Sequence, residues 1–159
     1  QGAVGLTEEG GFFSHLTHRS AKGEMLKVKI PDQPEDQIIS SNGWLVPVGN
    51  HTYKAGATYE WKDMTGSTSP EGRDQVEAKV RSMLGSDEFE VLEHTAGVRP
   101  ILRKSQPLIG SHPEHPQIKF FNGLGSKGVI TAPSVARHFA DHLVEGVPLD
   151  PDLDMGVFT

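Results

Sequence analysis

Residues 23–30 read Gly-Glu-Met-Leu-Lys-Val-Lys-Ile, and this stretch decides the class of fold. Its residues Leu26, Val28 and Ile30 occupy alternate positions, and the two lysines lie between them. A β-strand with this spacing places apolar side chains on one face and ammonium groups on the other. The stretch therefore predicts a strand with one buried face.

The residues that follow predict a meander of antiparallel strands. Ile38-Ile39 begins a strand, residues 41–43 (Ser-Asn-Gly) supply a hairpin turn, and residues 44–48 return. After a turn at residues 49–51, residues 52–59 form a further strand. The next element is a helix, because Ser69 is a good N-cap before Pro70, and Gly85 is a typical helix end.

The last third of the chain is predicted to be strand, loop, strand and helix. A strand covers residues 89–98, prolines make residues 102–117 mostly irregular, and residues 118–121 form a short strand. A helix then runs from about Thr131 until Gly146. Its apolar face would be formed by Val135, Phe139 and Leu143, and the tail would dock through Phe158 or stay unordered.

This order of elements predicts an α+β fold, a mixed and mostly antiparallel sheet covered by helices. The chain has 159 residues, a formal net charge of −6 and no cysteine. Disulfides, thiolate metal sites and a cysteine nucleophile are therefore excluded. The acidic balance argues against nucleic acid held by phosphate contacts, and no apolar run is long enough to span a membrane. We expect a cytoplasmic protein.

The eight histidines invite a metal hypothesis, which their spacing does not support. The close pairs are His138 with His142, His112 with His115, and His15 with His18. None has an identifiable third ligand, and no Glu completes an H-E-x-x-H helix. No metal site is predicted, and the absence of G-x-S-x-G leaves no basis for a serine hydrolase.

Gly123-x-Gly125-x-x-Gly128 spells the dinucleotide-binding motif between a predicted strand and a helix. No second strand with an acidic end follows about 20 residues later, so the βαβ unit of that motif is missing. The glycines and the free N–H groups at the helix start would still suit an anion. A tight turn without a ligand is the alternative, and the residues leave both open.

Arg99 and Trp44 are the other two candidates for binding. Arg99 lies between a strand end and Pro100, a rigid position suited to bidentate carboxylate recognition. The alternative is an ordinary ion-paired arginine at a strand end. Trp44 would either line a pocket or pack in the core of the sheet.

An ordered set of short motifs resembles the C-terminal half of FAD-dependent oxidoreductases of the glycine oxidase and D-amino-acid oxidase type. The set comprises Gly23–Leu26, Trp44–Pro47, Tyr53, Ala55–Thr58, Ala96–Pro100, Gln106–Gly110, Asn122–Gly128 and Ala132-Pro133. The resemblance implies a connecting segment at residues 1–21, a substrate-binding domain at 22–106 and the C-terminal part of the FAD-binding domain at 107–159.

The resemblance also implies roles for particular residues. Arg99 would bind the substrate carboxylate, with Trp44 and Lys127 as further substrate-binding residues. The cofactor contacts would come from Gly97, Asn122, Gly123, Leu124, Gly125, Ser126, Lys127, Gly128 and Val129. No side chain would be a covalent catalyst, because the flavin carries the chemistry.

The implied function is oxidation of an amino acid or related amine by hydride transfer to FAD. The implied partners are that small molecule and an N-terminal FAD-binding portion that this chain lacks. The chain alone is then expected not to hold FAD tightly. A non-catalytic binding or interaction domain derived from this fold is the alternative. A tRNA-modifying flavoenzyme is a third possibility, which the acidic charge does not support.

Overall fold

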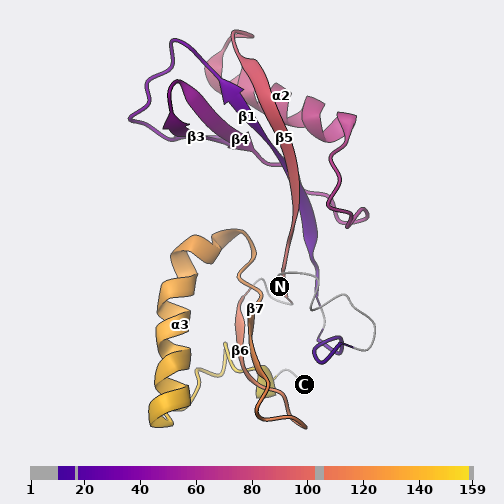
Figure 1. Ribbon diagram of the computed structural model, residues 1–159, viewed down its shortest axis with the longest axis vertical. Coiled ribbons are helices and arrows are strands. Elements are labelled where there is room, and N and C mark those ends of the chain that lie inside the picture. The colour runs from indigo at the N-terminus through magenta and orange to yellow at the C-terminus, as the bar shows by residue number, and fades with distance from the viewer. Residues whose placement is uncertain (1–10, 17, 103–105, 158–159) are drawn as a thin grey trace. The chain divides into compact units, whose positions relative to one another are not determined.

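The structure is a computed structural model that describes residues 11–16, 18–102 and 106–157 (Figure 1). The chain divides into two compact units. Residues 22–98 form the sheet unit, and residues 1–21 together with 99–159 form the hairpin unit. Each unit has hydrophobic side chains packed in its own interior.

The sheet unit has five strands in the order β2-β3-β4-β1-β5. The strands are β1 (Ala21–Lys29), β2 (Ile39–Ser40), β3 (Trp44–Gly49), β4 (Thr52–Gly56) and β5 (Glu90–Arg99). The pairs β2 with β3, β3 with β4, and β4 with β1 are antiparallel. The predicted fold class, an α+β fold with a mostly antiparallel sheet, is therefore confirmed.

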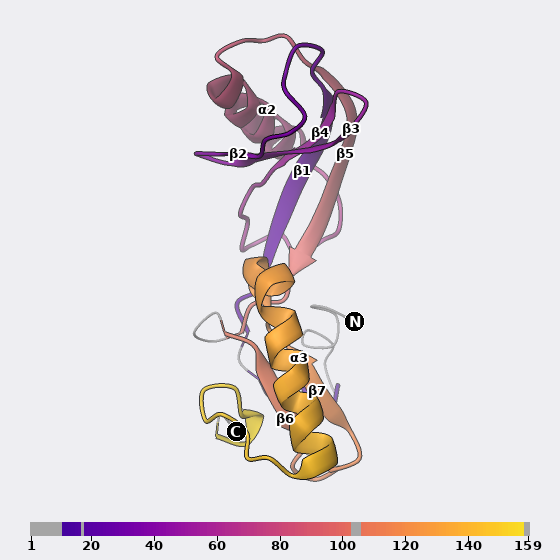
Figure 2. The ribbon, with the colours of Figure 1, turned by 90° about the vertical axis from the view of Figure 1, so that its left-hand side faces the viewer.

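Helix α2 (Pro70–Leu84) covers one face of this sheet (Figure 2). Leu26 and Val28 of β1 are fully buried with Val76 and Val80 of the helix. The alternation in β1 produces this face, because every second side chain points toward α2.

The ends of α2 are where the sequence predicts them. Ser69 is the N-cap, and its Oγ accepts a hydrogen bond from the Gly72 N–H at 3.0 Å. Gly85 ends the helix with φ of 70°, and its N–H donates to the Arg81 carbonyl at 2.8 Å. This left-handed conformation is the reason a glycine stands there.

The hairpin unit contains β6 (Leu108–Ser111), β7 (Lys119–Asn122), the short 3-10 helices η2 (Gly125–Lys127) and η3 (Met155–Val157), and α3 (Gly128–Glu145). The sequence predicts that residues 102–117 are mostly irregular. This prediction is wrong for β6, which lies in that range and pairs antiparallel with β7. Prolines flank β6 without interrupting its ladder. Helix α3 starts three residues earlier than expected, because the 3-10 turn of η2 leads directly into it.

The chain after α3 packs back onto the hairpin unit. The Ile109 N–H donates to the Leu153 carbonyl at 2.8 Å, and Met155 is fully buried. Phe158, the expected docking residue, lies outside the described residues. Leu143, expected on the buried face of α3, is 45% exposed, whereas Phe139 is buried as expected.

No helix in the described part of the chain combines the length and the apolar character needed to cross a membrane.

Candidate functional site

The glycine loop, residues 122–128, connects β7 to α3 and contains two left-handed glycines. Gly123 has φ of 83°, and a Cβ there would lie 2.5 Å from Leu102 Cδ1. Gly125 has φ of 57°, and the nearest atom to its Cβ would be Ile101 Cγ1 at 3.8 Å. Gly123 is therefore required by packing as well as by conformation, while Gly125 borders open space. Gly128 has an ordinary helical φ of −55°.

Polar contacts hold the start of this loop in place. Asn122 Oδ1 accepts from the Gly123 N–H at 2.8 Å. The Gly125 N–H donates to the Pro100 carbonyl at 3.1 Å. Pro100 directly follows Arg99 in the chain, so the structure brings the end of β5 and the glycine loop together within the hairpin unit.

The first turn of α3 exposes large apolar side chains. Val129 is 94% exposed and Ile130 is 81% exposed, although both belong to a helix that packs its other face in the unit. Sequence reasoning included Val129 in the candidate site and missed Ile130. Ile130 could have been found from the sequence, because two large apolar residues, Val129 and Ile130, directly follow the glycines. A turn that only connects a strand to a helix does not require them.

The electrostatics of this helix start favour an anion. No side chain caps α3, and its N-cap residue is Lys127, which is exposed. A helix N-terminus carries partial positive charge, so a lysine there adds to it instead of neutralising it. Leu124 is partly exposed and Ser126 exposed beside it. Together these residues can hold a group with an apolar body and an anionic edge.

Arg99 is partly exposed at the end of β5. Gly97, two residues earlier, is exposed, and nothing lies within 4 Å of a Cβ built on it. Gly97 and Trp44 belong to the sheet unit, whereas Arg99 and the glycine loop belong to the hairpin unit. Of the candidate residues, the structure therefore groups Arg99 with residues 122–129.

Trp44 lies outside the hydrophobic core of the sheet unit and is partly exposed. It pairs with Gly56, and a Cβ on Gly56 would lie 2.8 Å from Trp44 Cζ2. The indole therefore packs over the backbone of β4, which only a glycine permits. Its neighbour Leu45 is buried beneath α2, so Trp44 faces the side of the sheet opposite the helix.

The histidine pairs have structural contacts of their own. His138 Nε2 accepts from the Asp150 N–H at 3.0 Å, and His142 Nδ1 lies 2.8 Å from the Val147 carbonyl oxygen. His112 is buried, and its Nδ1 accepts from two backbone N–H groups at 3.2 Å. Among the described residues, no group of three or more His, Asp or Glu side chains could hold a metal ion.

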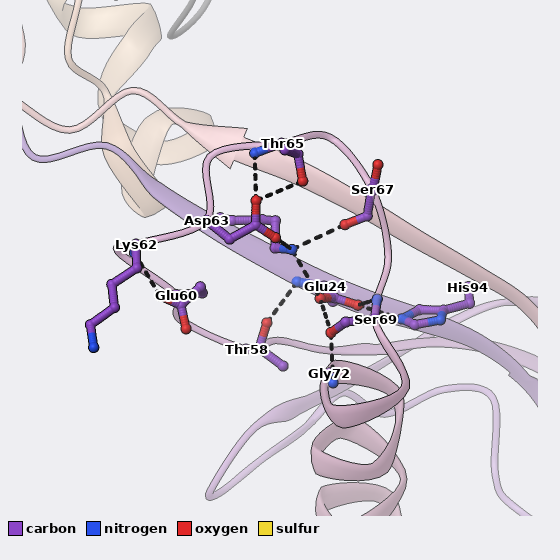
Figure 3. A network of polar contacts seen from close by, with 11 residues as sticks. Glu24, Thr58, Glu60, Lys62, Asp63, Thr65, Ser67, Ser69, Gly72 and His94 are labelled. Carbon is purple, nitrogen blue, oxygen red and sulfur yellow. Dashed lines mark hydrogen bonds and ion pairs between the residues drawn. The ribbon is translucent and has the colours of Figure 1, made fainter.

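Sequence reasoning missed a buried polar network centred on Glu24 (Figure 3). The side chains of Lys22 and Glu24 are each only 3% exposed. Glu24 accepts from the Ser69 N–H at 2.9 Å and from the Ser69 hydroxyl at 2.8 Å. Lys22 Nζ donates to Asp63 and to the Ser67 carbonyl. Both charges alternate with apolar residues in β1, and nothing in that pattern distinguished them from solvated charges.

The pKa shifts in this network follow from these contacts. Burial alone would raise the pKa of Glu24, but the hydrogen bonds from Ser69 and the Lys22 ammonium lower it below its ordinary value. The hydrogen bond from Lys22 lowers the pKa of Asp63, and the same contact raises the pKa of Lys22. His94 Nε2 lies 2.8 Å from Glu24 Oε2, without hydrogen-bond geometry. The network joins β1 to the N-terminus of α2.

Comparison with known proteins gives a consistent result. The family model described as "FAD dependent oxidoreductase" matches residues 4–142. The chain is 30% identical over 138 residues to a glycine oxidase of Bacillus subtilis, covering 83% of this chain and 37% of the relative. It is 26% identical over 142 residues to a bifunctional tRNA 5-methylaminomethyl-2-thiouridine biosynthesis protein of Marinobacter nauticus, covering 82% of this chain and 22% of the relative.

Solved structures show the same fold. A glycine oxidase from Geobacillus kaustophilus superposes with a TM-score of 0.79 at 22% identity, covering 100% of this chain and 44% of the other. An iminodiacetate oxidase from Chelativorans superposes with a TM-score of 0.71 at 20% identity, covering 87% of this chain and 39% of the other. The chain thus spans less than half the length of each of these proteins.

Proposed function

Because the chain belongs to the family of FAD-dependent oxidoreductases, we propose that it forms part of an enzyme that oxidises an amino acid or a related amine. In this proposal, residues 22–106 form the substrate-binding domain and residues 107–159 form the C-terminal part of the FAD-binding domain. FAD, when bound, supplies the two-electron oxidation of the substrate. The observation that carries the proposal is the exposed apolar turn beside the uncapped, cationic start of α3.

The residues at this turn fit a flavin, which has a flat apolar body and an anionic edge after reduction. Val129 and Ile130 offer apolar surface, and backbone N–H groups at the start of α3 offer hydrogen bonds. Lys127 adds a positive charge at the same place. These groups would stabilise the anionic edge and so favour oxidation of the substrate.

Arg99 is proposed to hold the carboxylate of the substrate. Its guanidinium can form two parallel hydrogen bonds to a carboxylate, and its backbone is fixed between β5 and Pro100. Trp44 is proposed to line the substrate pocket, because its indole lies on the face of the sheet that α2 leaves uncovered. A fixed carboxylate limits which bond of the substrate can react.

The flavin contact is tested by Ile130→Asp in the longer enzyme proposed here. We expect the Kd for FAD to rise about tenfold, because a carboxylate replaces apolar contact and repels an anionic edge. Val144→Asp is the matched control, since Val144 is 84% exposed on the same helix. Fluorescence titration of the apoprotein measures both. An equal effect of the two substitutions would contradict the assignment.

A further inference from the structure

The sheet unit contains a cavity of about 560 Å³ where β1 ends and β5 begins, at the top of Figure 1. Its walls come from residues 29–33, from Leu84 at the end of α2, and from side chains between Ser86 and Glu90. All of these residues belong to residues 22–98, so the cavity lies within one unit. A cavity of this volume has the size of a pocket for a small organic molecule.

The apolar part of the cavity belongs to the hydrophobic core. Ile30 is 4% exposed, and Leu84 and Phe89 are partly buried and pack against the same core. The wall at residues 31–33 is also held in place, because the Tyr53 hydroxyl donates to the Gln33 carbonyl at 2.6 Å. The cavity therefore offers an apolar surface that is formed before any ligand binds.

The polar part of the cavity is acidic. Three carboxylates line it, those of Asp32, Glu88 and Glu90, against the single ammonium group of Lys29. These carboxylates are exposed, and none takes part in an ion pair among the residues that the structure describes. The excess of negative charge favours a cation as the ligand.

The nearest guanidinium does not supply that cation. The Arg81 side chain lies over the Phe89 ring, with its Cζ 5.6 Å from the ring centroid. It already forms ion pairs with Glu77 and Asp87. Arg81 is therefore neutralised by carboxylates that do not line the cavity.

The cavity is separate from the indole proposed to line the substrate pocket. Trp44 and Met25 both pair with Gly56, in one row across the sheet. Lys29, at the cavity, is four residues further along β1 than Met25, which is about 13 Å along the strand. A ligand of the cavity is thus distinct from a substrate beside Trp44.

We propose that this cavity binds a small organic cation. The ligand has an aromatic or aliphatic body, which packs against Ile30, Leu84 and Phe89, and one ammonium group, which the carboxylates of Asp32, Glu88 and Glu90 attract. The assignment stands apart from the proposed amine oxidation, because it uses neither the flavin nor Arg99.

Binding to the 159-residue chain tests the proposal. The probe is benzyltrimethylammonium, a quaternary ammonium ion with one aromatic ring and no N–H. Calorimetric titration compares it with neutral benzyl alcohol and anionic phenylacetate. The cation should bind about tenfold more tightly than benzyl alcohol, and phenylacetate should bind more weakly than either. Equal affinity of the three probes, or preference for the anion, would overturn the proposal.

Two substitutions test the role of the charges. At about 0.15 M salt, where charges are screened beyond about 8 Å, Asp32→Asn and Glu88→Gln should each weaken binding of the cation about threefold. Together they should weaken it about tenfold, to the affinity of benzyl alcohol. Because both side chains are exposed, the variants should fold, and circular dichroism checks this.

Glu93→Gln is the matched control. Glu93 is an exposed carboxylate that does not line the cavity, three residues after Glu90 in β5 and so about 10 Å along the strand. This substitution should change the Kd by less than about 1.5-fold. If Glu93→Gln weakens binding as much as Glu88→Gln, the cation responds only to the net charge of the chain, and the proposal is wrong.

The position of the bound probe provides an independent check. Tyr59 and Trp61 form an exposed aromatic stack in the same unit, with ring centroids 5.7 Å apart, and such rings also attract cations. In backbone amide NMR spectra, the probe should shift the signals of Ile30 and Phe89. Shifts at Tyr59 and Trp61 without shifts at Ile30 and Phe89 would place the cation elsewhere and overturn the proposal.

Discussion

At the scale of single residues, glycines and buried charges carry the most specific requirements. The spacing of Gly123, Gly125 and Gly128 is visible in the sequence. The structural reason for a glycine at each position is not. Gly123 meets Leu102, Gly125 borders open space, and Gly128 is an ordinary helical residue. Spacing alone cannot separate these three roles, because the close contact at Gly123 comes from Leu102, which is not its neighbour in the chain.

Gly123→Ala should destabilise the hairpin unit by about 2 kcal/mol, since the methyl group combines left-handed strain with overlap against Leu102. Gly125→Ala adds a similar strain without the overlap and should cost about 1 kcal/mol. Urea unfolding compares the two variants. A larger loss for Gly125→Ala would contradict the packing described for the loop.

Glu24→Gln should destabilise the sheet unit by about 2 kcal/mol, because the buried Lys22 loses one of its two carboxylate partners and keeps only Asp63. Glu88, an exposed carboxylate in the loop between α2 and β5, provides the control, and Glu88→Gln should stay within about 0.5 kcal/mol. Chemical unfolding at neutral pH measures both, and equal losses would count against the network.

The same carboxyl group should give the sheet unit an acid-sensitive stability. The folded pKa of Glu24 lies below its ordinary value of 4.5, so the unfolded chain binds protons first as the pH falls. The stabilisation is therefore complete above pH 4.5 and is lost as the pH falls toward the folded pKa. Glu24→Gln should flatten this dependence. An unchanged slope in the variant would refute the assignment.

At the scale of elements, local chemistry predicts α2 well and β6 poorly. The ends of α2 are set by residues within one turn of them, namely Ser69, Pro70 and Gly85. The local sequence is therefore enough to predict where this helix begins and ends. Strand β6 has only four residues between prolines, and it forms because β7 pairs with it. Although β7 is the next element in the chain, so short a segment between prolines carries no alternation pattern that would indicate the pairing.

Ser69→Ala should cost about 2 kcal/mol, because it removes both the cap of α2 and a hydrogen bond to Glu24. Ser134→Ala on α3 removes only an exposed contact to the Thr131 carbonyl and should cost less than about 0.5 kcal/mol. Thermal unfolding followed by circular dichroism distinguishes them. Similar losses for both serines would show that the cap is not coupled to Glu24.

At the scale of the whole molecule, the sequence predicts the α+β class and the family, while the roles of single residues in binding are proposals. Short motifs in the right order identify the family because each is a local requirement of the fold. They do not reveal the uncovered apolar turn at Val129 and Ile130, because the exposure of a side chain depends on which faces other elements cover.

The 159-residue chain alone should bind FAD only weakly, because it spans 37% of the length of the Bacillus subtilis glycine oxidase to which it is similar. In the proposed enzyme the rest of the FAD site would come from additional chain. Titration of FAD into this chain, followed by flavin fluorescence, checks the expectation. A purified chain with one flavin per molecule would contradict it.

The central claim is that this chain helps FAD to oxidise an amine whose carboxylate is held by Arg99. Anaerobic mixing of the FAD-loaded enzyme with amino acids, followed by flavin absorbance, tests it most directly. The account predicts that amino acids bleach the flavin band. It also predicts that Arg99→Ala lowers kcat/KM about 100-fold for them but little for the corresponding decarboxylated amines. A flavin that no amine bleaches, or an unchanged Arg99→Ala variant, would contradict the account.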